Sequence, residues 1–227
     1  MRFVAIVTAR KGSKSIKKKN LLEINKKPLI EYTFKELLKS KIGKNAYVVT
    51  DDDIIKKISK KYKINTEYFR PKKTSTDKSS SIETIHHFAK WLLKKKDFDA
   101  IISLQPTSPL RNFEDIDKAV NLFQKKNFDS LFSISESLEH PYETIDFKKG
   151  EKKIFFTLKK SQKFFRRQDY DINSFFINGA IYIFKKELIL KKKIYSKNNH
   201  GFYIMPKLRS LDVNDLEDIE IMKSILK

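Results

Sequence analysis

Up to Ser135, short apolar runs alternate with longer segments in which apolar residues recur every three or four positions. A short apolar run between polar residues predicts a strand buried on both faces, and the recurrence predicts a helix with one buried face. The expected strands are 3–7, 46–50, 64–69, 99–104 and 128–135. The expected helices are 28–41, 53–62, 80–95 and 112–126.

Strands that alternate with helices form successive βαβ units, so the pattern predicts an α/β fold with a Rossmann-like, doubly wound, mostly parallel sheet. The pattern changes over 136–174, where the segments are short and one of them, 153–158, is strand-like. We expect this region to be an inserted β-arm within a single domain that covers 1–227. Strands at 176–184 and 201–205 and a helix at 216–226 complete the domain.

The loop after the first strand, 10–20, is dense in cations and contains one of the five glycines of the chain. Ligands of open α/β sheets bind beyond the carboxyl ends of the strands. Gly12 allows a tight turn and a close approach of backbone N–H groups to an anion, Arg10 offers two parallel donors, and Lys19 offers a point charge. These features indicate polyphosphate binding, although the loop contains neither GxxxxGK[ST] nor GxGxxG. A solvated lysine-rich loop would have the same composition, so composition alone leaves both interpretations open.

The formal net charge of +21 arises from 42 lysines and 7 arginines against 28 acidic residues. Because the lysines are spread over every expected helix and loop, we favour a solvated basic surface over a nucleic-acid or membrane partner. The absence of cysteine excludes disulfides and thiolate metal sites. No apolar run is long enough for a membrane span or a leader peptide, so we expect a cytoplasmic protein.

Where lysine is the default cation, an arginine suggests a requirement for the planar guanidinium. Five of the seven arginines lie in loops that we expect to converge on one site. Asp51–Asp53 are interpreted as helix-capping residues. His86 and His87 are neighbours on an expected helix, so they cannot share a face, and we expect no metal site there.

Four further features accompany the cationic loop: a Ser/Thr loop at 72–81, the Gln105–Arg111 loop, the Arg166–Asp169 segment and a late carboxylate, Asp212. Together they suit nucleotidyl transfer, in which positioning and charge neutralisation carry most of the catalysis. A carboxylate such as Asp212 would hold Mg²⁺ beside the phosphates.

Five motifs in a fixed order carry a resemblance. The segment 9–20 resembles ARGGSKGxxxKN, 104–111 reproduces LQPTSPLR, 167–169 and 178–183 look like RQD and NGAIYI, and 210–214 resembles S-[IL]-D-[IV]-[DN]. On these motifs the chain resembles, nearly end to end, the acylneuraminate cytidylyltransferases, also called CMP-sialic acid synthetases. Members transfer CMP from CTP to the anomeric hydroxyl of a nine-carbon α-keto acid (nonulosonic acid) sugar and release pyrophosphate. They use Mg²⁺ and a nucleotide-diphospho-sugar-transferase-like core.

The resemblance implies roles for matched residues, and it implies a homodimer formed through the inserted arm at 136–174. The nucleotide-binding residues would be Arg10, Gly12, Ser13, Lys19, Asn20, Arg70, Ser79 and Ser81. The sugar-binding residues would be Gln105, Thr107, Ser108, Arg111, Arg167, Gln168 and Asn178. Arg10, Lys19 and Asp212 would be catalytic, and Asp212 and Asn214 would hold the metal.

The chain departs from the family pattern at several places: Asn214 replaces a second acid, Ser15 replaces a usual glycine, and Phe176 stands where many members have arginine, in a segment that is one residue longer than usual. If the missing arginine binds the sugar in other members, this chain binds its sugar differently, so legionaminic acid is a candidate substrate as well as sialic acid. Pseudaminic acid is a weaker candidate, because members that act on it tend to lack QPTSPLR. The alternatives are a nucleotidyltransferase for another keto-acid sugar, a catalytically weak paralogue, and a basic nucleic-acid-binding protein.

Overall fold

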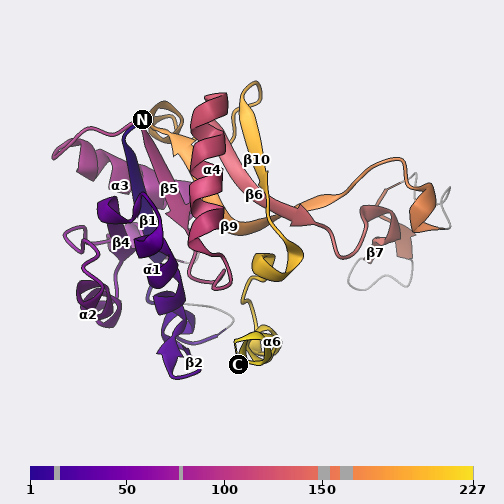
Figure 1. The fold of residues 1–227 in the computed structure, drawn as a ribbon, viewed down its shortest axis with the longest axis horizontal. Helices are drawn as coiled ribbons and strands as arrows, with labels where there is room; N and C mark the ends of the chain where they lie inside the picture. The colour runs from indigo at the N-terminus through magenta and orange to yellow at the C-terminus, as the bar shows by residue number, and fades with distance from the viewer. Residues whose placement is uncertain (13–15, 77–78, 148–153, 159–165, 227) are drawn as a thin grey trace.

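The computed structural model describes residues 1–12, 16–76, 79–147, 154–158 and 166–226. A six-stranded sheet in the order β10-β6-β9-β5-β1-β4 forms its centre (Figure 1). The strands of this sheet are β1 (Phe3–Ala9), β4 (Ala46–Thr50), β5 (Ala100–Leu104), β6 (Ser130–Glu136), β9 (Phe175–Lys185) and β10 (His200–Ile204). Two short antiparallel pairs lie outside it, β2 (Glu23–Ile24) with β3 (Lys27–Pro28) and β7 (Ile145–Phe147) with β8 (Ile154–Phe156).

The sheet is mostly parallel, as expected. β1 pairs in parallel with β4 and β5, and β10 pairs in parallel with β6. β9 runs antiparallel between β5 and β6. The direction of β9 follows from the chain path, because β9 returns from the arm without a crossover helix and a strand that returns directly must run the opposite way.

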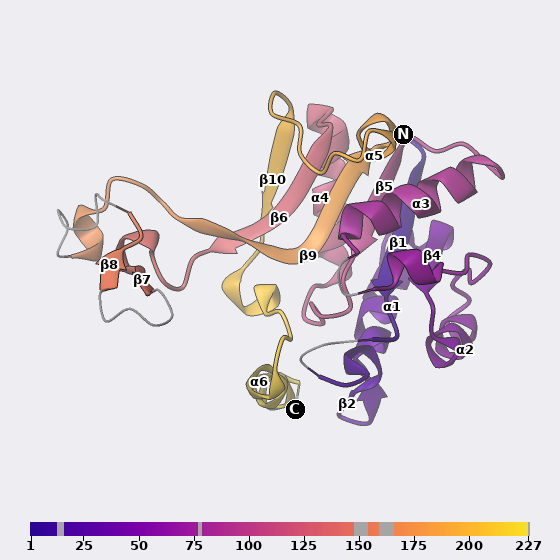
Figure 2. The ribbon, with the colours of Figure 1, turned by 180° about the vertical axis from the view of Figure 1, so that it is seen from behind.

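Helices cover both faces of this sheet, which confirms the doubly wound arrangement. On one face lie α1 (Leu29–Lys39) and α4 (Phe113–Lys126), and on the other lie α3 (Ser81–Leu93) and α5 (Lys186–Leu190). Outside these layers, α2 (Asp53–Lys61) packs beside β4, and α6 (Leu216–Ile225) packs against β2. Phe34 of α1 and Phe123 of α4 are fully buried in one core cluster. Phe88 of α3 and Ile189 of α5 are buried in a second cluster on the other face (Figure 2). Asp52 caps α2 through the N–H of Ile54 (2.8 Å), as its position in the sequence predicted.

The expected strand at 64–69 is wrong. Only two isolated bridges join this segment to β4, Tyr47 with Asn65 and Thr50 with Phe69. The Asn65 side chain accepts a hydrogen bond from the N–H of Glu67 (2.8 Å), which turns the backbone away from a continuous ladder. The apolar residues of the segment therefore reflect packing rather than sheet pairing, since Tyr68 is buried against Phe88.

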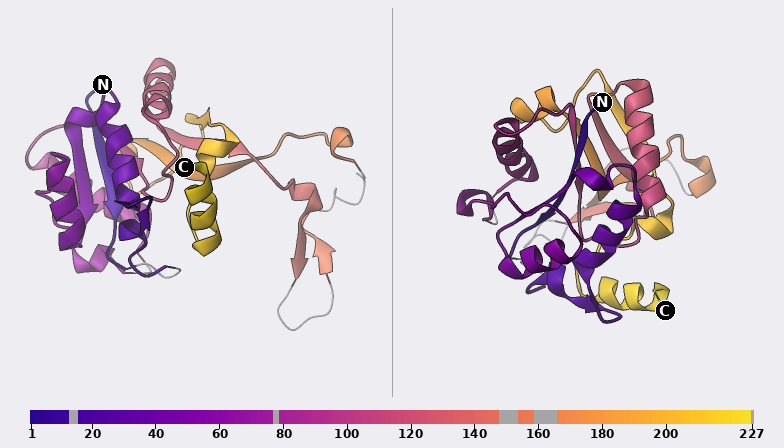
Figure 3. Two further views of the ribbon diagram at one scale, coloured as in Figure 1. Left: turned by 60° about the horizontal axis from the view of Figure 1, so that its bottom comes forward. Right: turned by 60° about the vertical axis from the view of Figure 1, so that its left-hand side comes forward.

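The segment between β6 and β9 extends away from the sheet (Figures 1 and 3). It carries the β7–β8 hairpin and the 3-10 helix η6 (Arg167–Asp169). Large apolar residues are exposed along it and along the start of β9, namely Leu138, Ile145, Phe147, Phe155, Phe156, Leu158, Ile172, Phe175, Phe176 and Ile177. In the part of the chain that the structure describes, no helix has the length and apolar character needed to span a bilayer.

Candidate functional site

The carboxyl ends of β1, β4 and β5 meet at one edge of the sheet because the three strands are parallel. The loops that follow them therefore lie together. A direct bond joins the first two loops, since Lys11 N donates to Asp51 Oδ1 (2.8 Å). Within the loop after β1, Asn20 Nδ2 donates to the carbonyl of Arg10 (3.3 Å) and closes the loop on itself.

Val213 connects this surface to the end of the chain. Its N–H donates to the carbonyl of Thr107 (2.7 Å), and its own carbonyl accepts a hydrogen bond from Lys19 Nζ (2.9 Å). The Val213 side chain is fully buried in a cluster that includes Ile16 and Met222. One residue therefore places the cationic loop, the Gln105–Arg111 loop and the neighbouring Asp212 side by side.

Lys19 and Arg10 supply positive charge to the surface. Partial burial lowers the pKa of Lys19 below its ordinary value, while the nearby Asp212 opposes that shift and Arg10 adds to it. Arg10 Nη1 donates to the carbonyl of Thr76 (3.2 Å), which ties the loop after β1 to the Ser/Thr loop. Ser79 joins the same arrangement through its hydroxyl, which lies 2.8 Å from Thr76 Oγ1.

Gly12 has a different role from the tight turn that we expected. Within the described chain, Gly179 is the only glycine with a positive φ (74°). A Cβ added at Gly12 would meet no atom within 4 Å. The space beside Gly12 therefore leaves its backbone accessible to an anion, which is the part of the expectation that the geometry supports. Ser13 lies outside the described residues.

Asp212 meets the requirement for a metal ligand. Its Oδ1 is buried and has no hydrogen-bond partner within the described residues, a costly arrangement that a cation would relieve. Asn214 donates from Nδ2 to Asp212 Oδ2 (3.1 Å), so in this structure it orients the carboxylate instead of presenting its carbonyl oxygen. The nearby Asp215 and Asp218 form the capping box of α6. The described residues contain no cluster of three His, Cys, Asp or Glu side chains suited to a metal.

A pocket of about 170 Å³ opens on the α3 side of the same sheet edge. Gln105 and Ser81 line it, as do Thr8, Ser103 and Tyr182, which the sequence analysis missed. Its remaining walls are apolar and consist of Ile85, Phe132, Ile177, Phe184 and Ile194. Burial, and to a smaller extent Asp212, raises the pKa of Tyr182. Ser103 was detectable as the one polar residue in an otherwise apolar strand, and Tyr182 as a member of the NGAIYI motif.

Gly179 gives this pocket its shape. Its positive φ of 74° lets β9 bend where the β6–β9 ladder shifts register. A Cβ at this position would lie 3.6 Å from Gln105 Oε1 and 3.8 Å from the hydroxyl of Tyr182. The glycine of the NGAIYI motif is therefore required for backbone conformation beside two pocket residues.

Arg111 does not line the site, contrary to expectation. It is fully buried and donates to the carbonyls of Ala180 (2.8 Å) and Gln105 (3.2 Å) and to Thr33 Oγ1 (2.9 Å). Burial lowers the pKa of Arg111 to about 10. The planar guanidinium thus holds the Gln105 loop against α1 and β9, and Ser108, which was also expected to bind the sugar, is equally buried.

Arg70 requires a similar correction. Its side chain is 6% exposed and donates to the carbonyl of Thr74 and to Thr84 Oγ1 (3.0 Å). Burial lowers the pKa of Arg70, and the charge of Arg10 adds to that shift. Arg70 therefore organises the loop beneath Arg10, and in this structure it has little surface with which to contact cytosine.

Asn178 also supports the site from within the fold. It is 2% exposed, accepts a hydrogen bond from Ser133 Oγ (2.6 Å) and donates to Ser210 Oγ (2.8 Å). Ser210 precedes Asp212 by two residues, so Asn178 fixes the segment that carries the carboxylate. The expected direct contact of Asn178 with the sugar is not what the structure shows.

Arg167 and Gln168 lie in η6 on the arm, and neither lines the two cavities at the sheet edge, the Gln105 pocket and the one beside Asp212. Arg167 is exposed and forms an ion pair with Glu143 (2.9 Å). The arm extends away from the sheet (Figure 3). Arg167 lines a separate cavity of about 190 Å³ at the base of the arm, which shares Glu136 and Lys207 with the cavity beside Asp212.

The family model described as Cytidylyltransferase matches residues 4–223. The chain belongs to the cytidylyltransferase family. An N-acylneuraminate cytidylyltransferase of Escherichia coli O18:K1:H7 is 33% identical over 236 residues, which cover 99% of this chain and 52% of that protein. The chain thus spans about half the length of that relative. A pseudaminic acid cytidylyltransferase of Campylobacter jejuni is 24% identical over 100% of this chain and 97% of that protein.

Among solved structures, the CMP:2-keto-3-deoxy-manno-octonic acid synthetase complexed with CTP aligns with this cytidylyltransferase family member at a TM-score of 0.71. The alignment covers 100% of this chain and 98% of that chain, at 14% sequence identity. This likeness confirms the expected nucleotide-sugar-transferase-like fold, and the family match confirms the resemblance read from the motifs.

The placement of Arg111 generates a test of stability. Arg111→Lys keeps the charge but cannot reach three acceptors in the plane of a guanidinium, so urea unfolding should show a loss of about 1–3 kcal/mol. Arg167→Lys, the same exchange at an exposed position of the arm, should leave the free energy of unfolding nearly unchanged, because exposed ion pairs contribute little to stability. An Arg111→Lys protein as stable as this control would contradict the supporting role.

Proposed function

We propose that the chain transfers CMP from CTP to the anomeric hydroxyl of a nine-carbon α-keto acid sugar, of the sialic or legionaminic acid type, and releases pyrophosphate. The observation that carries the proposal is the pair of hydrogen bonds at Val213, to Thr107 and Lys19. These bonds hold a phosphate-binding cation, an acceptor loop and a carboxylate at one sheet edge, as nucleotidyl transfer requires. CTP is an intracellular metabolite, so we place the reaction in the cytoplasm.

The nucleotide half of the site would consist of Arg10, Lys19, Asn20 and the open backbone at Gly12. The anomeric oxygen would attack the α-phosphorus, and the bond to pyrophosphate would break in line. Arg10 and Lys19 would neutralise the charge that develops on the leaving pyrophosphate. Burial strengthens this effect for Lys19, since a half-buried ammonium is less screened by water than an exposed one.

Asp212 would hold Mg²⁺, with Asn214 orienting the carboxylate and phosphate oxygens and water completing the coordination. When bound, Mg²⁺ would stabilise charge on the phosphate oxygens. The support for this assignment is the buried, unpartnered Oδ1 of Asp212. The same carboxylate is suited to accept the proton of the anomeric hydroxyl.

The pocket lined by Gln105 and Tyr182 would bind the sugar. Its hydroxyl and amide groups suit sugar hydroxyls, and its apolar wall, which includes Phe132 and Ile194, suits the acyl and methyl groups of N-acylated deoxy sugars. Among the described residues its lining contains no lysine or arginine, so we look for the cation that pairs with the sugar carboxylate outside this lining.

A homodimer formed through the arm would supply that cation. Arg167 and Gln168 line neither the Gln105 pocket nor the cavity beside Asp212 of their own chain, so we assign them to the site of a second copy. The exposed apolar residues of the arm, among them Phe147 and Phe155, would be buried in such a contact. An apolar cavity of about 500 Å³ lined by Phe176, Leu208 and Asp212 adjoins the base of the arm and offers a receiving surface.

The decisive experiment measures pyrophosphate release from CTP and Mg²⁺ with a panel of keto-acid sugars. We expect turnover on the order of 1 s⁻¹ or faster with sialic or legionaminic acid and with CTP alone among the nucleoside triphosphates. ATP, GTP and UTP serve as controls. Turnover confined to an eight-carbon keto acid would support the alternative substrate, and failure to bind CTP would contradict the proposal.

Asp212→Asn tests the metal site. The variant removes the charge that holds Mg²⁺, so turnover should fall at least about 100-fold while the melting temperature stays near that of the unaltered protein. Asp53→Asn, an exposed carboxylate in the first turn of α2, should leave turnover unchanged. Full activity of Asp212→Asn would place the metal elsewhere.

Mixing two inactive variants tests whether the sites are shared between subunits. In a dimer of an Arg167→Ala chain and an Asp212→Asn chain, one site would receive an intact Asp212 from its own chain and an intact Arg167 from the other. Co-refolding equal amounts should therefore restore roughly a quarter of the original activity, as random pairing in a symmetric dimer predicts. No recovery in mixtures that size-exclusion chromatography shows to be dimeric would contradict the sharing of sites.

A further inference from the structure

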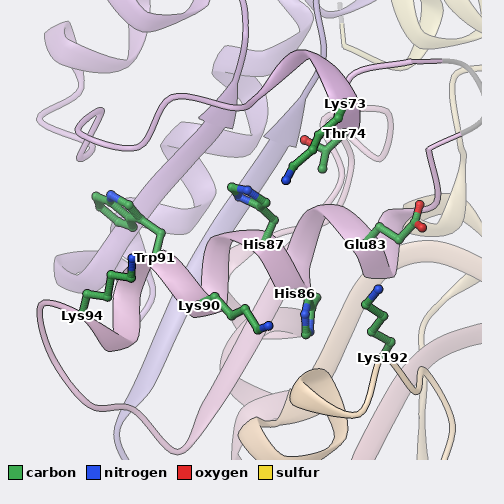
Figure 4. A pocket seen from close by; sticks show the side chains of 9 residues that line it. All are labelled: Lys73, Thr74, Glu83, His86, His87, Lys90, Trp91, Lys94 and Lys192. Atoms are coloured by element: carbon green, nitrogen blue, oxygen red, sulfur yellow. The ribbon is translucent and has the colours of Figure 1, made fainter.

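A concave surface of about 590 Å³ lies along α3, beyond the Ser/Thr loop at 72–81 and separate from the two cavities of the candidate site. We call it the α3 groove. Figure 4 shows that side chains of α3 and of two flanking segments surround it. Its lining residues are Lys73, Thr74, Glu83, His86, His87, Lys90, Trp91, Lys94 and Lys192. None of them lines the Gln105 pocket or the cavity beside Asp212.

The α3 groove concentrates positive charge. Its four lysines come from three segments, and within the described part of the chain none of them forms an ion pair with a carboxylate. The one acidic lining residue, Glu83, accepts a hydrogen bond from the N–H of Ser80 (3.1 Å) in the capping box of α3. Lysines are common on this protein, but here four exposed lysines surround one hollow, where an anion can contact several of them at once.

Two imidazoles in the groove are held in fixed orientations. His86 Nδ1 donates to the carbonyl of Ile189 (2.9 Å), because a carbonyl can only accept. His87 Nδ1 pairs with the hydroxyl of Tyr68 (2.8 Å). With its proton on Nδ1, the Nε2 of a neutral His86 is an acceptor, which a phosphate oxygen does not contact. Burial and the neighbouring Lys73, His86 and Lys90 lower the pKa of His87, which favours its neutral form. The lysines are therefore the donors that the groove offers an anion.

We infer that the α3 groove binds a small polyphosphate anion. A single phosphate group would leave most of the lysine repulsion in place, whereas a chain of phosphates can contact ammonium groups on both walls. Lysine suits this ligand, since a flexible point charge can follow phosphate oxygens that are not arranged for a planar fork. The volume also exceeds what one phosphate group fills.

The test uses Trp91, which is the single tryptophan of the chain and lines the groove. Its ring makes edge contacts with the rings of Tyr47 and Tyr68, at centroid separations of 6.1 Å and 5.2 Å. These contacts hold the indole in place, so a change in its fluorescence indicates binding at the groove. The full chain is titrated with sodium tripolyphosphate in EDTA, beside sodium sulfate at the same ionic strength. We expect a saturable change with tripolyphosphate alone.

Two charge-matched double variants locate the binding. Lys90→Gln with Lys94→Gln removes two groove cations at the end of α3, and affinity should fall roughly tenfold or more. Lys125→Gln with Lys126→Gln removes two cations at the end of α4, and it loses a similar favourable interaction with the helix dipole. In this variant the affinity should change less than about twofold. Lys192→Gln, outside any helix, should weaken binding in the same direction even if the first double variant fails to fold.

An equal loss in both double variants would show general charge attraction and would overturn the inference. Undiminished binding in the groove variants would place the anion elsewhere, at the candidate active site for example, and would overturn it too. A change with sulfate as large as that with tripolyphosphate would have the same consequence. The titration needs no turnover, so its failure is distinguishable from a failure of the proposed CMP transfer.

Discussion

Two hydrogen bonds to the backbone of Val213 hold the candidate site together. They join Lys19 near the start of the chain and Thr107 in its middle to a segment near its end. The buried Val213 side chain makes this junction rigid, because moving it would open the cluster around Met222. Asp212 directly precedes Val213 in the sequence, so the hydrogen bonds of Val213 also fix the backbone that carries the Asp212 carboxylate.

Buried polar side chains extend the same constraint below the surface. Arg111 connects the Gln105 loop to β9 and α1, and Asn178 connects β9 to the segment before Asp212. Each of these groups is costly to bury unless its hydrogen bonds are made, so a displaced loop would leave several groups unpaired. Arg111 and Asn178, which the motifs made candidates for ligand contact, instead hold in place the segments that carry Gln105 and Asp212.

The two faces of the α3 helix serve different purposes. Its inner face packs Phe88 and Leu92 against the sheet, and its first residue, Ser81, lines the Gln105 pocket. Its outer face carries Lys90 and Lys94 toward the α3 groove. Most of the lysines are spread over the surface, but the tertiary structure brings four of them together around the α3 groove. The positive charge of the chain therefore has a local role there in addition to keeping the surface solvated.

The sequence by itself determined the layer order, the helix caps and the family, because apolar periodicity and capping are local and the motifs are contiguous. It also identified Arg10, Lys19 and Asp212 as companions at one sheet edge, since parallel strands end together. Only the tertiary structure decided the direction of β9, the burial of Arg111 and Arg70, and the presence of Tyr182 in the Gln105 pocket. The physical reason is that burial depends on packing between distant segments. The local sequence around an arginine in a loop motif is the same whether its guanidinium binds a ligand or donates hydrogen bonds to the protein's own backbone.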